Sequence, residues 1–242
     1  MVMRLPVRFI SSIAGIAALA VCAGTCGNAQ STTAAPPASN GKYVVVDPLA
    51  GVRYDNRYDI SLGAAYGHMK AGPPPLQQGA NLGGLDLSGS YWLTKHWAGE
   101  ATGRVYMGTS GAAVNHANAN FGPIQGPFVS QYMFVAGPEW LGPHNKHGAF
   151  IAHAMIGGTY GDFEKDLLGN PPSVVGFFNN QVALAAIIGG HIDLNRSAHW
   201  AFRVTPDALY TRYGINYGNM ATYGYWNFGL SVGAEYKFKK KR

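Results

Sequence analysis

The charged residues whose spacing could support chemistry fall in pairs two or four positions apart. These pairs are Glu100 with Arg104, Arg203 with Asp207, and Glu235 with Lys237. Residues at even spacing share one face of an extended strand, so the members of each pair would lie on the same side. Carboxylates held close together repel one another unless cations bridge them, and the planar guanidinium group of arginine can bind two carboxylates at once. The pattern predicts a buried ion-pair network centred on Arg104 and Arg203.

Other charged residues and two histidines occupy the same polar faces. The full set expected to line one enclosed lumen is Asp59, Asp86, Glu100, Arg104, Glu139, His153, His191, Asp193, Arg203, Asp207, Glu235 and Lys237. The network itself is predicted to comprise Glu100, Arg104, Glu139, Arg203, Asp207 and Glu235. Such a network could be a gate or an ion path, or it could be salt bridges that fill the interior. Eight strands leave little open bore, which favours the filled interior.

Metal, thiol and cofactor chemistry have less support. His144 and His147 lie in one expected turn, but only two ligands are evident there. His153 and His191 are expected to be hydrogen-bonded lumen residues rather than metal ligands. Cysteines occur only within the first thirty residues, so the exported chain would have no disulfide, thiol nucleophile or thiolate metal site. We therefore predict no catalytic residue, no metal site and no cofactor.

The elements that must position the charged residues are eight segments in which apolar and polar residues alternate. They span about 57–69, 81–94, 97–108, 128–140, 149–160, 180–194, 200–213 and 226–238. A period of two indicates extended strands. In the last segment, large apolar residues such as Trp226 and Val232 alternate with small or polar ones such as Gly229 and Ser231. This pattern is typical of a strand with lipid on one side and a narrow polar lumen on the other.

The connections between these segments alternate in length. They are short after the second, fourth and sixth segments, and about ten to twenty residues long after the first, third, fifth and seventh. Short turns at one end and long loops at the other are typical of outer-membrane barrels. An even number of strands then places both chain ends on the periplasmic side. The long loops, with residues such as Asn115, Phe121, Phe163 and Leu167, are candidates for contact with partners outside the cell.

The outer surface of the barrel is expected to face lipid. Charged residues make up 12% of the chain, about half the usual share. A soluble carrier would turn its apolar face inward and leave mainly Gly, Ala, Ser and Thr on the outside, which is a poor surface for water. Aromatic residues at the short-turn end are expected to form a girdle at the membrane boundary. They are Trp97, Trp140, Trp200, Tyr236 and Phe238.

The two ends of the sequence differ from the barrel. Residues 1–30 combine a basic start, an apolar run and a small-residue end, as in a secretory signal peptide. Residues 31–56 are expected to be a periplasmic linker, although segment 43–46 has no assigned role. Residues 57–238 would form the barrel and residues 239–242 a basic tail. The formal charge of +6 comes from Arg4, Arg8 and this tail, so the net charge does not predict nucleic-acid binding.

The chain resembles the eight-stranded outer-membrane β-barrel proteins, the group that contains the OmpA membrane domain and OmpX. The resemblance covers about residues 57–238 and rests on the alternating strands, the turn–loop asymmetry, Gly137-Pro138-Glu139-Trp140 before a turn, and the aromatic end at Phe238. It implies an all-β, antiparallel, up-and-down transmembrane barrel. It also implies a monomer in outer-membrane lipid, inserted by the barrel-assembly machinery.

The function that this resemblance implies is structural or concerned with surface contact, without catalysis. Some barrels of this size edit lipid A, and the deacylase type places His and Ser two positions apart on a strand. None of the eight histidines here has a serine two positions later. A lipid-modifying enzyme and a narrow pore remain the alternatives, and the sequence identifies no extracellular ligand.

Overall fold

The computed structural model describes residues 47–74, 79–111, 113–114, 124–217 and 219–238. The expected signal peptide, residues 31–46 of the expected linker and the basic tail lie outside the described residues. So do Asn115 and Phe121, two of the residues that the sequence assigned to an exposed loop. All of the described residues belong to one compact unit.

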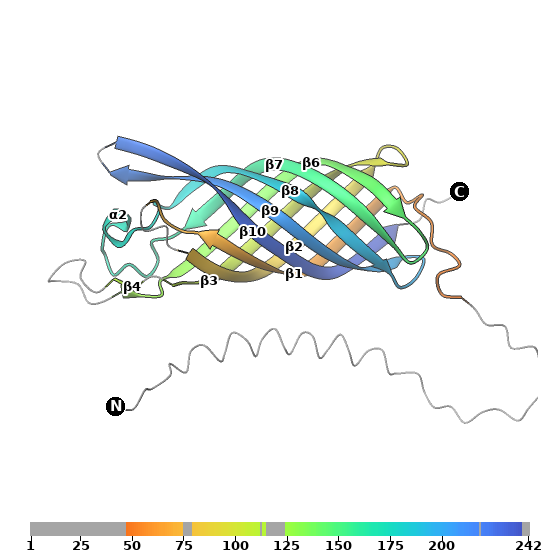
Figure 1. Cartoon of the computed structure of the whole chain (residues 1–242), viewed down its shortest axis with the longest axis horizontal. Coiled ribbons are helices and arrows are strands. Elements are labelled where there is room, and N and C mark those ends of the chain that lie inside the picture. The colour runs from red at the N-terminus through yellow and green to blue at the C-terminus, as the bar shows by residue number, and fades with distance from the viewer. Residues whose placement is uncertain (1–46, 75–78, 112, 115–123, 218, 239–242) are drawn as a thin grey trace, which may run out of the picture. The chain divides into compact units, whose positions relative to one another are not determined.

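Eight long antiparallel strands close into a barrel (Figure 1). They are β1 (Tyr58–Lys70), β2 (Gly79–Trp92), β3 (Trp97–Ser110), β6 (Phe128–His144), β7 (Gly148–Asp162), β8 (Gln181–Asn195), β9 (Trp200–Tyr217) and β10 (Asn219–Phe238). Each strand pairs with its neighbours in the sequence of long strands, and β1 closes the ring against β10, with Tyr58 opposite Phe238. The predicted fold class, an eight-stranded antiparallel up-and-down barrel, is confirmed.

The remaining elements are short and lie in connections. The two-residue strands β4 (Ala113–Val114) and β5 (Ile124–Gln125) pair with each other between β3 and β6. The helix α2 (Pro172–Val175) lies between β7 and β8 and ends at Gly176, whose φ of 84° is in the left-handed region that favours glycine. No helix in the described ranges is long and apolar enough to cross a membrane.

Each strand places large apolar side chains outside, whereas the buried face carries the charged residues together with small and some apolar ones. On β8, for example, Leu184 and Ile188 are about half exposed while His191 and Asp193 are buried. The same alternation holds on β7, whose two faces are both fairly apolar in sequence: Ile151 is buried and Phe150 is exposed. The inversion that the sequence predicted, with aliphatic side chains outside and charge inside, is present around the whole barrel.

The prediction of a long loop between the seventh and eighth strands is wrong. Strands β9 and β10 instead continue as one hairpin that projects beyond the other strands (Figure 1). Tyr213 pairs with Tyr223, and the guanidinium of Arg212 donates to the Thr222 hydroxyl at 3.2 and 3.3 Å. The segment contains Tyr217, Tyr223 and Tyr225, and tyrosine favours strands. Gly214 and Gly224, which locally favour a loop, are paired in the ladder with Thr222 and Arg212.

A second difference concerns the connection between β7 and β8. Phe163 and Leu167 were expected to be exposed loop residues, but both are buried. They pack with Phe177 and Phe178 against side chains from the barrel interior, including Tyr213. The ring of Phe163 lies 5.0 Å from that of Tyr213 and 5.8 Å from that of Phe178. Burial of these apolar side chains explains why the segment folds onto the barrel instead of extending into solvent.

Close approach of two backbones at the barrel seam yields a prediction about Gly233. Gly233 lies opposite Gly63 where β1 meets β10, and a Cβ atom on Gly233 would lie 2.1 Å from the Leu62 carbonyl oxygen. We expect Gly233→Ala to lower the free energy of unfolding by about 1–3 kcal/mol, the usual cost of overpacking. Denaturant titration in detergent micelles measures this. Gly103→Ala is the matched control, because its Cβ would meet nothing within 4 Å; an equal loss in both variants would contradict the prediction.

Candidate functional site

The barrel lumen is the candidate site, because it collects the buried charge of the described chain. All twelve charged residues and histidines that the sequence assigned to the lumen are buried, each at most 5% exposed. They comprise seven carboxyl groups, three permanently cationic side chains and two histidines. The ion pairs divide the set into two clusters rather than one continuous network.

The first cluster surrounds Arg203, near the end of the barrel with short turns. Nε of Arg203 lies 2.7 Å from Oδ1 of Asp193, and its Nη2 lies 3.0 Å from Oδ2 of the same carboxylate. The same Nη2 lies 2.7 Å from Oε1 of Glu235. Lys237 adds a second cation, with Nζ 3.3 Å from Oε2 of Glu235 and 3.0 Å from Oδ1 of Asn195. One arginine fork therefore joins carboxylates from two strands, β8 and β10.

The second cluster surrounds Arg104. Its Nη2 lies 2.5 Å from Oδ2 of Asp207 and 3.2 Å from Oδ2 of Asp86. The Ser231 hydroxyl donates to the same oxygen of Asp86 at 2.7 Å. The other oxygen of Asp207, Oδ1, lies 2.9 Å from Nε2 of His153. Asp207 thus connects the Arg104 guanidinium to the lumen histidines.

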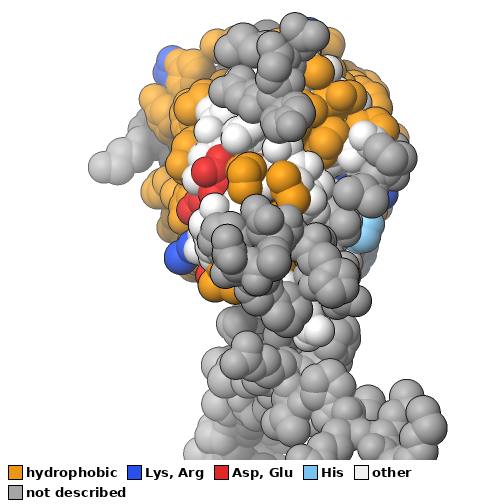
Figure 2. All heavy atoms as spheres, turned by 90° about the vertical axis from the view of Figure 1, so that its left-hand side faces the viewer, with side chains coloured by type: hydrophobic (Ala, Val, Ile, Leu, Met, Phe, Trp, Pro, Cys, Tyr) orange, Lys and Arg blue, Asp and Glu red, His pale blue; other side chains and the backbone are white. Residues whose placement is uncertain are grey.

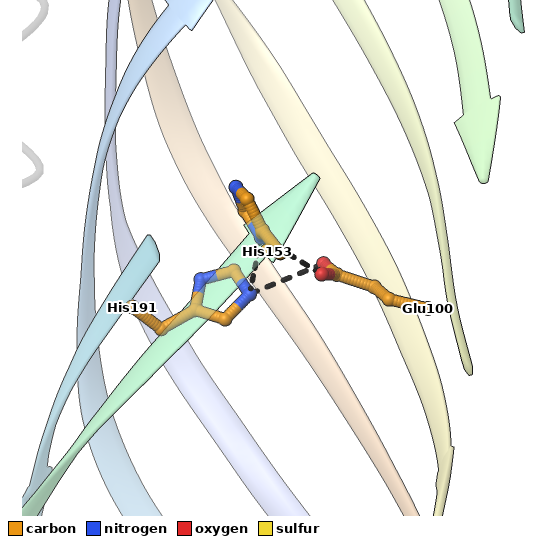
Figure 3. A group of neighbouring side chains, drawn as sticks. All are labelled: Glu100, His153 and His191. Carbon is orange, nitrogen blue, oxygen red and sulfur yellow. Dashed lines mark hydrogen bonds and ion pairs between the residues drawn. The ribbon is translucent and has the colours of Figure 1, made fainter. Parts of the chain in front are cut away.

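The histidines meet a third carboxylate, Glu100, from across the lumen (Figure 3). Nδ1 of His153 lies 2.8 Å from Oε2 of Glu100, and Nε2 of His191 lies 3.2 Å from Oε1. The same two ring nitrogens are 3.1 Å apart. The outer nitrogen of His191, Nδ1, lies 2.8 Å from the Thr205 hydroxyl, and the Thr102 hydroxyl donates to Oε1 of Glu100 at 3.0 Å.

The structure brings together five of the six residues predicted for the network. Arg104, Asp207 and Glu100 belong to the second cluster, and Arg203 and Glu235 to the first. Glu139 is also fully buried in the lumen, but neither of its carboxylate oxygens has a hydrogen-bond partner among the described residues. Glu139 therefore shares the lumen with the network without joining it.

Sequence reasoning did not find the grouping of Glu100, His153 and His191. The alternating pattern places all three inside the barrel, but it does not fix their relative heights. Strand tilt and stagger decide which residues of different strands meet across a lumen. A register shift between Leu141 and His144 in the pairing of β6 with β7 adds a local offset that the pattern does not reveal.

The predicted aromatic residues form a band at the turn end of the barrel. Trp97, Trp200 and Phe238 are 42–52% exposed, and Trp140, 40% exposed, pairs with Trp97. Tyr236 stands between two of these residues, with its ring 4.9 Å from that of Trp200 and 4.8 Å from that of Phe238. A second band of exposed aromatic residues, at the loop end, was missed. It includes Tyr66, Tyr132, Tyr160, Trp226 and Phe228.

Several solved structures are similar to the chain, and two of them align with a TM-score of 0.50. Neisserial surface protein A (NspA) aligns with a TM-score of 0.50 and 12% sequence identity, covering 75% of this chain and 97% of NspA. The outer membrane protein OprG from Pseudomonas aeruginosa aligns with a TM-score of 0.50 and 15% identity, covering 78% of this chain and 99% of OprG. No protein-family model and no curated protein matches the sequence.

The similarity to these structures concerns the fold, and it agrees with the features of the barrel itself. An apolar outer wall between two aromatic bands and a polar lumen are the features of a barrel that spans a membrane. The chain therefore has the fold of the eight-stranded outer-membrane β-barrels.

Proposed function

We propose that this protein is a monomeric outer-membrane barrel with a closed lumen, and that it serves as a structural element and as a rigid support for surface contacts. The observation that carries the proposal is the contrast between the outer and the inner face of the barrel wall. Exposed side chains such as Leu85, Phe134 and Ile188 are apolar, whereas charged side chains are packed inside. An apolar wall of this extent would aggregate in water, but in lipid it stabilises the protein.

The filling of the lumen supports closure. At the turn end, Arg203 and its carboxylates cross the interior, and the Arg104 cluster lies beyond them. Nearer the loop end the interior is apolar, with Leu82, Ile187 and Leu209 fully buried, and the 163–178 segment packs over them. Two large hollows, of about 680 and 670 Å³, are lined mainly by residues of the outer wall such as Tyr58 and Leu85. Two small cavities, one beside Gln131 and one beside Arg203, each have a volume of about 10 Å³. Such volumes hold about one water molecule.

The expected location and export route follow from the termini of the barrel and from the sequence before it. The ends of β1 and β10 pair at the turn end, which is the periplasmic end of barrels with this loop asymmetry. The basic and apolar residues of segment 1–30 would direct export. The two similar structures are, by name, a surface protein and an outer membrane protein. Lipid and the barrel-assembly machinery are the partners that this location requires.

The loop end would supply the surface contacts. Figure 2 looks onto this end, where hydrophobic, acidic and basic side chains are mixed around the rim. The β9–β10 hairpin extends farther than the other strands (Figure 1) and exposes Arg212. Side chains presented on a rigid barrel are well placed to bind a partner, since the barrel holds their positions fixed.

Closure of the lumen predicts the outcome of electrical recording. The exported chain, folded in detergent and added to planar bilayers, is expected to give no stable unitary conductance. Arg104→Ala is expected to remain silent as well, because the apolar layer nearer the loop end would still be intact. A general porin prepared in the same way is the positive control. Stable conductance steps that change with Arg104→Ala would refute the closed lumen.

Membrane fractionation tests the architecture separately. The exported chain should fractionate with outer membranes, require detergent for extraction and migrate differently on gels before and after heating. Recovery in the soluble periplasmic fraction would refute the barrel's membrane location, whatever the recording shows.

A further inference from the structure

We propose that Glu100, His153 and His191 form a binding site for one divalent transition-metal ion of the zinc class, inside the barrel. This inference goes beyond a closed, structural barrel and does not depend on whether the lumen conducts. The three residues come from β3, β7 and β8, and their side chains converge on one point (Figure 3). One potential ligand atom from each residue lies within 4.8 Å of the other two.

The distances between these atoms are close to those of a coordination shell. Nδ1 of His153, Nε2 of His191 and the Glu100 carboxylate oxygens are separated by 2.8, 3.1 and 3.2 Å. Zinc binds nitrogen and carboxylate oxygen at about 2.0–2.2 Å, so ligand atoms of a tetrahedral ion lie roughly 3.4 Å apart. An outward movement of a few tenths of an ångström would therefore admit the ion. Two imidazoles and a carboxylate are also a ligand set that zinc accepts in proteins.

The outer nitrogens of both histidines are held as they are in metal sites. Nε2 of His153 lies 2.9 Å from the Asp207 carboxylate, and Nδ1 of His191 lies 2.8 Å from the Thr205 hydroxyl. An ionised carboxylate only accepts, so Nε2–H of His153 donates to Asp207; the neutral tautomer that makes this bond carries the lone pair of Nδ1 on the side of Glu100, where it could bind a metal ion. Metal-bound histidines typically donate their second N–H in this way, which orients the ring.

The lumen also lacks cations. The buried charge of the described barrel comprises seven carboxyl groups and three permanently cationic side chains. Arg104 already forms ion pairs with Asp86 and Asp207, and Arg203 forms ion pairs with Asp193 and Glu235. No lysine or arginine of the described chain forms an ion pair with Glu100. With the inner nitrogens of both rings unprotonated, as metal binding requires, the buried Glu100 carboxylate would need a cation between it and the two lone pairs.

Two cations could meet this requirement: a metal ion, or a proton that makes His153 an imidazolium between Glu100 and Asp207. The 3.1 Å contact between the two inner nitrogens favours the metal. With a proton on His153 Nδ1, either that proton is shared between Glu100 and His191, or His191 Nε2 carries its own hydrogen toward Glu100 and two N–H groups lie 3.1 Å apart. A metal ion would bind all three residues at once, with water as a fourth ligand. The proton becomes the alternative outcome of the test.

The test uses the exported chain folded in detergent, with folding verified by heat-modifiable gel migration. The chain is folded in the presence of Zn²⁺, because a closed lumen would block later entry of the ion, and is then dialysed against metal-free buffer; mass spectrometry of the elements is expected to find one zinc per folded chain. Co²⁺ in place of Zn²⁺ should give the visible absorption of a tetrahedral site. Glu100→Gln and His153→Gln should each abolish both signals. The control is His96→Gln with His144→Gln, which removes an exposed pair of histidine rings 6.4 Å apart at the turn end.

The outcomes separate the two cations. Zinc retained by the surface control and lost in the lumen variants would support the site. No zinc in the folded wild type, or zinc that persists in folded Glu100→Gln and His153→Gln, would overturn it in favour of the imidazolium. If the lumen variants do not fold, Thr205→Val provides the test, because it removes only the partner of His191 Nδ1. Its zinc affinity should fall about 10–100-fold, and an unchanged affinity would overturn the proposal.

Discussion

Arg203→Met is expected to lower the free energy of unfolding by about 3–5 kcal/mol, the usual cost of breaking a buried ion pair from one side. The Arg203 side chain is 3% exposed and joins Asp193 to Glu235, whose side chains are 0% and 1% exposed. Methionine fills similar space but leaves both carboxylates with Lys237 as their remaining cation, at 4.0 and 3.3 Å. Denaturant titration of the folded barrel, followed by tryptophan fluorescence and gel migration, measures the loss.

A second arginine on the same strand provides the control for this experiment. Arg212 is exposed and contacts only the Thr222 hydroxyl among the described residues. Arg212→Met should change stability by no more than about 0.5 kcal/mol, as for other surface substitutions. Arg203→Lys should give an intermediate loss, since it keeps the charge and loses the fork that binds both oxygens of Asp193. Equal stability of Arg203→Met and Arg212→Met would show that the first cluster contributes nothing to folding.

The fold was predictable because one physical pattern repeats along the chain. Every long strand must divide its side chains between lipid and lumen, and the period of two makes this division readable at single residues. Ile188 and His191 on β8 illustrate it, since they differ by an odd number of positions and lie on opposite faces. The same reasoning identified all twelve buried charged residues and histidines of the lumen.

Contacts that depend on three dimensions were not predictable in this way. The sequence gives no account of how far each strand is displaced along the barrel relative to the next. For that reason the two arginine clusters could not be separated, and Glu139 could not be excluded from them. The burial of Phe163 and Leu167 depends on the return of a whole loop to the barrel interior, which no local period encodes.

The length of the β9–β10 hairpin was not predictable from the sequence for a different reason. Glycine is a common signal for turns, and Gly214 and Gly224 interrupt an otherwise strand-like stretch. In the structure both glycines are paired, Gly214 with Thr222 and Gly224 with Arg212. Continuous pairing with the neighbouring strand outweighed the local preference, because each paired residue satisfies its backbone groups.

The buried charge and the apolar outer wall both follow from the alternation of side chains between the two faces of each strand. A closed lumen would exclude water and so raise the cost of any unpaired charge. The guanidinium groups of the two lumen arginines offset part of this cost, and a bound cation at Glu100, His153 and His191 would offset more of it. Because the same strands carry both faces, a substitution on the outer wall tests the lipid environment without altering these contacts.

Ile188→Arg is expected to destabilise the barrel in lipid vesicles by about 2–4 kcal/mol, the cost of arginine on the lipid face at the bilayer midplane. Ile188 lies at the middle of β8 and is 55% exposed. Leu194 lies on the same face of the same strand, near its turn end, and is 43% exposed. Leu194→Arg should therefore cost only about 0–1 kcal/mol, because its side chain can reach the interface.

The depth dependence is what identifies lipid as the environment of the wall. Unfolding in vesicles, titrated with denaturant and followed by tryptophan fluorescence, compares the two variants with the wild type. A wall in contact with water would tolerate arginine equally well at Ile188 and at Leu194, since both are exposed and charge is hydrated at either height. Equal and small losses would thus contradict a membrane-spanning barrel. A large loss at the middle of the strand and a small one at its end require a hydrocarbon layer around the barrel, centred on Ile188.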